Sequence, residues 1–316
     1  MRDATWYSLI LLTFLFPFQI AAQNAPPPGQ KVEPGWLVKA GVSLMSMKST
    51  GQLDDKIDSY DEDPQVEEKV LPLPTLQLIY NDRAETGNWL FGSKRSGLVI
   101  ERKQKTGIGV FAVEAGVNLF SLVKVDLPTN DYKNPYLLGE TRDTTGKSQI
   151  TQTASYSVGK AFGLTLRANR LDLKYEDDET PEVDSALGRN GYKETGTVEL
   201  RLWLLGLGYD SISNHTEGEA DSYTGFNQSG NLRIPLFIEG LMAIVRGSYG
   251  KAEYEAVHPI FNETREDITE SSTFMLMYRT EERTIQFLSS HSKTDSNIDF
   301  FDKSSSVISL GATWDF

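Results

Sequence analysis

The sequence ends in "SVISLGATWDF", residues 306–316, and this stretch alternates in character from one residue to the next. Ile308, Leu310, Ala312, Trp314 and Phe316 fall on one face, and small or polar residues occupy the positions between them. A period of two residues is the pattern of a β-strand with one apolar face. Aromatic residues become denser toward the end of the chain, where soluble domains usually fray into polar residues. The stretch therefore predicts a strand with an apolar environment along its whole length.

The composition excludes several classes of protein. The chain has 316 residues, of which 39% are hydrophobic and 10% aromatic, and it contains no cysteine. It is too polar for a bundle of membrane helices and too aromatic for a disordered chain. The absence of cysteine removes disulfides, a thiol nucleophile, a cysteine-based zinc cluster and a lipid-modified N-terminal cysteine. A formal net charge of -13 argues against nucleic acid as a partner.

The only long apolar run lies near the N-terminus. Leu9–Phe18 ("LILLTFLFPF") follows Arg2 and precedes the small residues Ala21 and Ala22, which is typical of a secretory signal peptide of residues 1–22. An uncleaved anchor is the alternative interpretation. Residues 23–34 ("QNAPPPGQKVEP") are rich in proline and predict an extended periplasmic leader. We therefore expect one exported domain, residues 35–316.

From Gly35 onward, stretches of about ten residues alternate apolar with polar or small residues, as membrane-spanning strands do. We count about 14 such strands, with 12 as the alternative. A soluble β-sandwich shows the same period, but its connections do not alternate in length. Here the long connection 49–69 is followed by the tight "NDRAETG" (81–87), and later connections repeat this order. The pattern predicts an all-β transmembrane antiparallel barrel with short periplasmic turns, long extracellular loops and both termini periplasmic.

A spanning sheet must pair every backbone group, so the final strand is expected to close on the strand that begins at Trp36. A final strand that carries Trp314 and ends in Phe316 resembles the signal by which barrel-assembly machinery recognises outer-membrane proteins. That resemblance implies this machinery as a partner, and the location implies contact with outer-membrane lipid and lipopolysaccharide.

Four tryptophans are expected at one rim of the barrel. Trp36, Trp89, Trp203 and Trp314 all lie near a short turn or at the start or end of the predicted barrel, where an interfacial aromatic belt belongs. The parity of Trp203 is inconsistent with this position, because it shares a face with Arg201.

The polar faces of the strands supply the candidate pore-lining residues. By parity the following residues point into the lumen and carry both signs of charge: Lys39, Glu101, Lys103, Glu114, Asn118, Arg167, Asn169, Glu199, Arg201, Arg246 and Arg279. In an open pore they would pass small polar solutes with a mild charge preference, and in a closed lumen they would form buried ion pairs. About 14 strands enclose more space than side chains fill, which favours a pore unless loops fold inward. The loop 126–147, with Tyr132 and Tyr136, is the candidate plug.

No enzyme activity, cofactor or metal is predicted. His215, His258 and His291 are the only histidines and fall in or next to predicted outer loops, and a serine beside a histidine, as at Ser213 or Ser290, makes no triad without a positioned acid and an oxyanion hole. A lipid hydrolase at the rim is the remaining enzymatic alternative.

The loop 53–69 is strongly acidic, and Asp58, Asp61 and Asp63 are its candidate cation ligands. Carboxylate oxygens at this density suit calcium or magnesium, but the spacing is not that of an EF-hand loop. We therefore expect a solvated, mobile loop without a bound metal.

Several blocks of the sequence resemble one family: "EPGW" (33–36), "NPYLLGETRDTTGKSQ" (134–149), "LGRNGY" (187–192), "HPIFNETRED" (258–267) and "DSNIDFFDKSSSVISLGATWDF" (295–316). They are similar to an uncharacterised family of proteobacterial outer-membrane proteins, known as a domain of unknown function. The resemblance covers about residues 34–316 and implies the fold and the location, but no activity. We expect a passive channel for small hydrophilic solutes, with a closed-lumen structural or surface-interaction barrel as the alternative.

Overall fold

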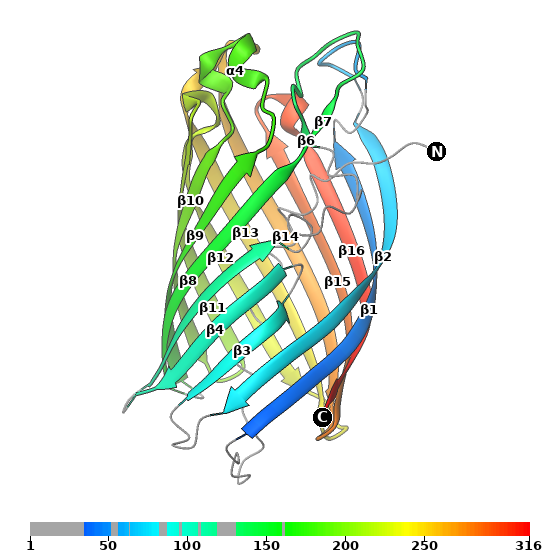
Figure 1. The fold of residues 1–316 in the computed structure, drawn as a ribbon, viewed down its shortest axis with the longest axis vertical. Helices are drawn as coiled ribbons and strands as arrows, with labels where there is room; N and C mark the ends of the chain where they lie inside the picture. Colours follow the sequence, from blue (N-terminus) through cyan, green and yellow to red (C-terminus); the bar gives the residue numbers. More distant parts are fainter. Residues whose placement is uncertain are drawn as a thin grey trace.

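The computed structural model describes residues 35–51, 56–62, 64–81, 87–94, 97–106, 109–118, 131–159 and 162–316. The predicted signal peptide and leader lie outside the described residues, as does Asp63. Within them, 14 strands form a closed barrel in which every strand pairs antiparallel with both neighbours (Figure 1). The predicted all-β barrel is confirmed, and the alternative of 12 strands is wrong.

The barrel strands follow one another around the wall in chain order. They are β1 Gly35–Gly51, β2 Gln65–Asn81, β3 Gly87–Lys94, β4 Gly97–Lys105, β5 Gly109–Asn118, β8 Lys147–Gly159, β9 Phe162–Tyr175, β10 Gly191–Leu202, β11 Leu205–Thr216, β12 Tyr223–Pro235, β13 Leu241–His258, β14 Glu263–Arg279, β15 Arg283–Ser296 and β16 Lys303–Asp315. In their described parts, the connections hold a small sheet and four short helical segments: β6 Asp131–Tyr132, β7 Thr144–Thr145, α4 Thr180–Val183, η1 Ser185–Leu187, η2 Glu219–Asp221 and η3 Asp299–Phe301.

The seam between β16 and β1 closes the sheet as the final strand predicts. Their register runs from Lys39 opposite Asp315 to Thr50 opposite Ser304. The N–H of Phe316 donates to the carbonyl of Val38 at 2.8 Å, and the N–H of Val38 donates back at 3.1 Å. The pairing therefore extends to the last residue of the chain.

The outer face of the barrel has an apolar band that lipid can cover. In β1 and β16, Leu44, Ile308 and Leu310 are 56%, 54% and 60% exposed, whereas the intervening Met45 and Val307 are each 3% exposed. Exposed apolar side chains on an outer wall with fully paired strands define a transmembrane β-barrel. Among the described residues, no helix is long and apolar enough to cross a bilayer.

Toward the end of the barrel that carries the long loops, the outer face becomes charged. Arg170 pairs there with Glu194 at 3.2 Å, and Lys251 pairs with Glu266 at 3.1 Å. We call this the loop end, and the opposite end, where the C-terminus lies (Figure 1), the turn end. The band of charge marks the level above which the strands leave the apolar environment.

Strands β13 and β14 are longer than the sequence pattern predicts. The stretch "AVHPIFNETREDIT" (256–269) has the sequence of a long loop, but only residues 259–262 connect the strands, because β13 continues to His258 and β14 starts at Glu263. These strands have 18 and 17 residues, and a tilted strand needs only about 9–11 to cross a bilayer. The extra length carries the barrel wall beyond the apolar band.

Candidate functional site

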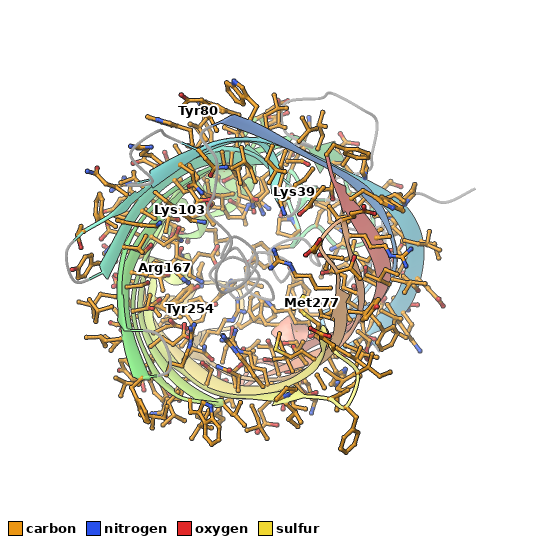
Figure 2. All side chains as sticks on the ribbon, turned by 90° about the horizontal axis from the view of Figure 1, so that it is seen from below. Lys39, Tyr80, Lys103, Arg167, Tyr254 and Met277 are labelled. Carbon is orange, nitrogen blue, oxygen red and sulfur yellow. The ribbon has the colours of Figure 1, made fainter. Side chains whose placement is uncertain are left out.

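The predicted lumen residues lie on the inner face of the barrel. Figure 2 shows Lys39, Lys103 and Arg167 directed into the interior, whereas Tyr80 lies on the outside. The ammonium of Lys39 lies 2.9 Å from Asp315, which ties the inner faces of β1 and β16 together. Lys103 pairs with Glu101 at 3.3 Å.

Several other predicted residues share this inner face. Glu101 is only 4% exposed and lies opposite Glu114 in the β4–β5 register. Asn169 accepts a hydrogen bond from Thr153 at 2.8 Å. Arg279 ends β14 on the same face as Met277, whereas the side chain of Asn118 lies outside the described residues. The pore-lining role of these residues stays a prediction.

Four arginines from neighbouring strands form what we call the arginine wall: Arg167 on β9, Arg201 on β10, Arg233 on β12 and Arg246 on β13. Arg246 interacts electrostatically with Asp210 and Glu199, and Arg233 interacts with Glu199. Arg233 and Asp210 were not among the predicted lumen residues, although both alternate correctly with outward-facing residues in their strands. Four arginines and two carboxylates thus share the inner face of β9 to β13.

Strand β11 contributes two glycines, Gly206 and Gly208, to the inner face between Arg201 and Arg233. Gly206 lies between Arg201 and Asn231 in the register, and Asn231 lies opposite Arg246 on β13. A Cβ atom built on Gly206 would be 2.2 Å from the side-chain nitrogen Nδ2 of Asn231, so the side-chain amide of Asn231 lies over Gly206. The missing side chain leaves a notch in the arginine wall that Asn231 partly fills.

Three polar atoms around the notch are buried without a hydrogen-bond partner among the described residues: Arg201 Nε, Glu199 Oε1 and Asn231 Oδ1. Asn231 itself is 4% exposed. A buried donor or acceptor without a partner costs roughly 1–3 kcal/mol, so such groups are rare in a finished core. These atoms are therefore candidates for contact with water or solute.

Another part of the inner face is apolar. Met45, Met275, Met277 and Leu288 are at most 8% exposed and come from β1, β14 and β15. Strand parity did not reveal the methionines of β14, because Phe274 and Leu276 on the outer face are apolar too. The interior is consequently asymmetric, with an apolar side and the arginine wall.

The four predicted rim tryptophans all lie toward the turn end and are exposed, Trp36 by 63%, Trp89 by 38%, Trp203 by 70% and Trp314 by 41%. Trp203 is not a strand residue: it follows β10 in the turn before β11, with a positive φ of 58°. Strand parity therefore does not apply to it, which resolves the inconsistency in the sequence pattern. It stays a prediction that these tryptophans form a membrane-interface belt. The role of Trp314 and Phe316 as an assembly signal likewise stays a prediction.

At the loop end, residues from six connections pack into one apolar cluster. Its members are Ile57, Tyr60, Tyr136, Ala186, Leu187, Ala220, Ile260, Phe261, Ile298, Phe300 and Phe301. We call the segments that carry them the loop cap. The predicted plug loop contributes Tyr136, which lies 5.8 Å from the Phe300 ring and 5.2 Å from the His258 ring. Loops from all around the barrel therefore meet in a common core.

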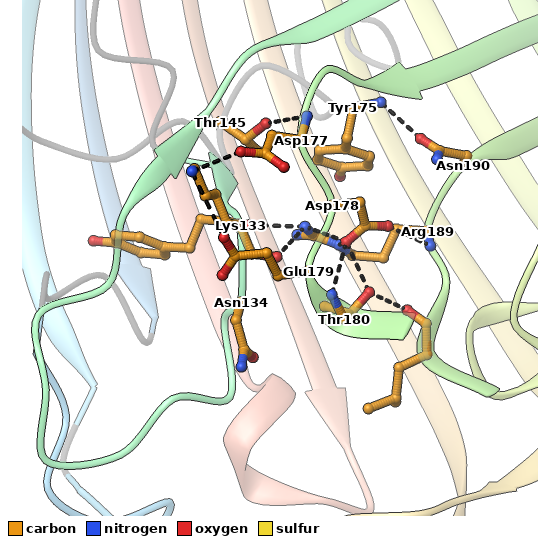
Figure 3. Close-up of polar contacts among 12 residues, drawn as sticks. Lys133, Asn134, Thr145, Tyr175, Asp177, Asp178, Glu179, Thr180, Arg189 and Asn190 are labelled. Carbon is orange, nitrogen blue, oxygen red and sulfur yellow. Dashed lines mark hydrogen bonds and ion pairs between the residues drawn. The ribbon is translucent and has the colours of Figure 1, made fainter. Parts of the chain in front are cut away.

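A buried ion pair ties the cap together (Figure 3). Arg189 donates to the Asp178 carboxylate from Nε at 3.0 Å and from Nη2 at 2.8 Å, and its Nη2 also donates to the carbonyls of Tyr132 and Lys133. Burial opposes ionisation of Asp178, but the hydrogen bonds and charge of Arg189 outweigh it and lower the pKa of Asp178. Asp178 also accepts from the Thr180 hydroxyl at 2.7 Å.

A second buried pair lies where the cap meets the barrel. Arg265 donates to Asp267 from Nε at 2.8 Å and from Nη2 at 2.6 Å. Its guanidinium lies 4.5 Å from the Tyr254 ring and 3.7 Å from the Phe301 ring. Beside it, burial raises the pKa of Asp221 to about 6, although Arg265 opposes this shift.

His258, predicted in or next to an outer loop, ends β13 and is fully buried in the cap. The N–H of Ile260 donates to Nδ1 at 3.3 Å, so the ring proton is on Nε2, which lies 3.1 Å from the Tyr136 hydroxyl. Burial lowers the pKa of His258 to about 4, and the nearby charge of Arg265 acts in the same direction. The histidine is therefore held neutral.

The remaining candidates form no complete site among the described residues. Ser213 lies 2.8 Å from His215 Nε2, but no described carboxylate is hydrogen-bonded to that histidine. Asp58 and Asp61 are exposed, and Glu62 accepts from the backbone of Asp58 at 2.7 Å within its own loop. No group of three or more metal-binding side chains occurs in the described part of the chain.

Fold and interior together define a transmembrane β-barrel with a charged inner wall. Residues 36–315 match the family described as "Protein of unknown function (DUF2860)", and the chain belongs to this family. The expected relationship to an uncharacterised family is thus confirmed. No curated protein matches the sequence.

Solved structures of bacterial outer-membrane proteins are similar in fold. The outer membrane channel DcaP of Acinetobacter baumannii is 12% identical, covering 91% of this chain and 99% of its own, with a TM-score of 0.44. A loop L8 deletion mutant of OmpT, an outer membrane protein of Vibrio cholerae, is 10% identical over 89% and 99%, with a TM-score of 0.40. OpdQ of Pseudomonas aeruginosa is 7% identical over 89% and 98%, also with a TM-score of 0.40.

Proposed function

We propose that the protein is a passive, energy-independent channel of the bacterial outer membrane for small hydrophilic solutes. The supporting observation is the arginine wall, where charged side chains face the interior and polar atoms of Arg201, Glu199 and Asn231 are buried without partners among the described residues. A barrel closed for structure alone would pair or replace such groups, because unpaired buried charge is costly. Water and polar solutes in the lumen would satisfy them.

The orientation belongs to the same proposal. The short turns and the first and last residues of the barrel domain face the periplasm, and the loop cap faces the outside. Exposed tryptophans at the turn end and ion pairs on the outer face at the loop end support this arrangement, since the two ends then contact different interfaces. Lipopolysaccharide and outer-membrane lipid are the surrounding partners, and the barrel-assembly machinery is the partner during insertion.

Single-channel recording in a planar bilayer tests the channel. We expect discrete conductance steps with a preference for anions, and the triple variant R167Q/R201Q/R246Q should reduce the anion-to-cation permeability ratio several-fold. The matched control is R170Q, which removes an arginine from the outer face of β9. A bilayer that stays silent for the wild type and for variants that loosen the loop cap, with protein that still shows heat-modifiable gel mobility, would overturn the proposal.

The second candidate is a closed-lumen structural or surface-interaction barrel. The loop cap favours it, because six connections share one apolar cluster at one mouth of the barrel. In that case the bilayer stays silent for the wild type and for variants that loosen the cap. Conductance that appears only after the cap is loosened would instead indicate a channel with a closed resting state.

A further inference from the structure

The notch at Gly206 is built differently from the rest of the arginine wall. The Asn231 side chain covers Gly206, and the Ser229 side chain covers Gly208 in the same way. A Cβ atom built on Gly208 would be 2.6 Å from the Ser229 hydroxyl oxygen. Side chains of β12 therefore occupy the space above β11 and approach β10, which carries Glu199 and Arg201. The two glycines permit this approach, since neither presents a side chain to the lumen.

The polar atoms at the notch call for a ligand with two kinds of group. Arg201 Nε is a buried donor, and Glu199 Oε1 and Asn231 Oδ1 are buried acceptors, all without partners among the described residues. A carboxylate suits the arginine, because it accepts side-on from the planar guanidinium. The two acceptors need donors, which a carboxylate lacks.

The charge around the notch decides which donors fit. Four arginines (167, 201, 233 and 246) face two carboxylates (Glu199 and Asp210), so the balance of four positive and two negative charges is +2. This balance attracts an anion and disfavours an ammonium group as the second function. Hydroxyl groups supply donors without adding positive charge.

We propose that the notch formed by Arg201, Gly206, Asn231 and Glu199 is a binding subsite for small hydroxylated carboxylates. The inference rests on the proposed channel function and names the solute class for it. The carboxylate binds at Arg201 within the field of Arg233, and hydroxyl groups donate to Asn231 and Glu199. Such a subsite in the wall concentrates the solute in the lumen.

Equilibrium dialysis of radiolabelled gluconate against the folded, detergent-solubilised protein tests the subsite without requiring conduction. The competitors are hexanoate, which has the charge without hydroxyls, and sorbitol, which has hydroxyls without charge. We expect both to compete at least about tenfold more weakly than unlabelled gluconate, because each leaves buried groups of the notch unpaired. Equal competition by hexanoate would overturn the proposal, since it would reduce the subsite to a general charge effect.

The variant G206A fills the notch, because its Cβ forces the Asn231 amide to move, and N231L removes the acceptor. Each should weaken gluconate binding about tenfold. The matched control is G230A on the neighbouring strand, where an added Cβ meets nothing within 4 Å and binding should be unchanged. If G206A loses heat-modifiable gel mobility, the test of the subsite rests on N231L. Gluconate binding at wild-type strength in a folded G206A or N231L variant would overturn the proposal.

The same proteins in a planar bilayer separate the two proposals. Conductance without gluconate binding leaves the channel intact and overturns the subsite. Gluconate binding that depends on Gly206 and Asn231 in a protein that does not conduct supports the subsite and overturns the channel.

Discussion

The arginine wall and the loop cap both bury charge, but they treat it in opposite ways. In the cap, Arg189 and Arg265 each make two hydrogen bonds to a carboxylate. Arg189 also donates to two backbone carbonyls, and Arg265 lies against two aromatic rings. In the wall, Arg201 keeps a buried nitrogen without a partner among the described residues. A satisfied network holds segments in one arrangement, whereas an unsatisfied one leaves groups for water or solute. The difference separates a region that organises structure from one suited to function.

The largest expected effect is on the cap. Replacement of Arg189 by alanine leaves Asp178 buried and unpaired, which should destabilise the loop cap by about 3–5 kcal/mol. Hydrogen exchange of loop amides measures this as a local opening free energy. The barrel strands should keep their protection, because their backbone pairing does not depend on the cap.

Arg170 is the matched control for Arg189. Arg189 lies 4.2 Å from the Tyr175 ring, and Arg170 likewise lies 4.0 Å from the Tyr192 ring. Arg170 pairs with Asp172 at 3.0 Å, but its side chain is 42% exposed. R170A should therefore cost less than about 1 kcal/mol. Similar losses for R170A and R189A would show that the cap network is no stronger than a surface ion pair.

A smaller effect is expected from acid. The pKa of His258 is lowered to about 4 from 6.5, so its contribution to cap stability is complete above pH 6.5 and is lost as the pH falls toward 4. The full loss is roughly 3 kcal/mol. Asp221 opposes it, because its pKa is raised to about 6 and protonation between pH 6 and 4 favours the folded cap.

Loop-directed proteolysis between pH 7 and 4.5 measures this balance. We expect H258Q to abolish the acid-induced loosening and D221N to enlarge it, because only one of the two opposing groups then titrates. H291Q is the control, since His291 is exposed on β15 and bonds Ser306 outside the cap. An unchanged pH profile in H258Q would remove His258 from the account of cap stability.

The smallest effect is expected at the acidic loop, which contributes Ile57 and Tyr60 to the cap but carries Asp58 and Asp61 exposed to solvent. Asp58 is paired with Lys56 at 3.1 Å, and its side chain is 71% exposed. Calcium should therefore give little protection of residues 53–69 from protease. A saturable calcium effect that D58N/D61N/D63N abolishes would show a cation site and an adhesive or lipopolysaccharide-bridging surface.

Much of the fold follows from local pattern. Alternation along residues 306–316 and along β1 indicated the strands, and the need to pair both edges indicated closure. Inner-face residues such as Arg167 and Arg246 were found because a period of two assigns faces without knowledge of neighbours. The pattern failed where local structure changes, as at Trp203, which lies in a turn, and where both faces are apolar, as at Met275 and Met277.

Short-range alternation in the sequence is sufficient to predict the barrel, its strand faces and the charged character of its interior. Which inner residues meet depends on the assembled sheet: the Gly206 notch requires the register of β10, β11 and β12, and no spacing in the chain encodes it. The same holds for the cap, where Tyr136 meets His258, 122 residues away, and Phe300. Contacts of this kind depend on how loops from separate strands converge at one end of a closed wall, which is a property of the assembled barrel.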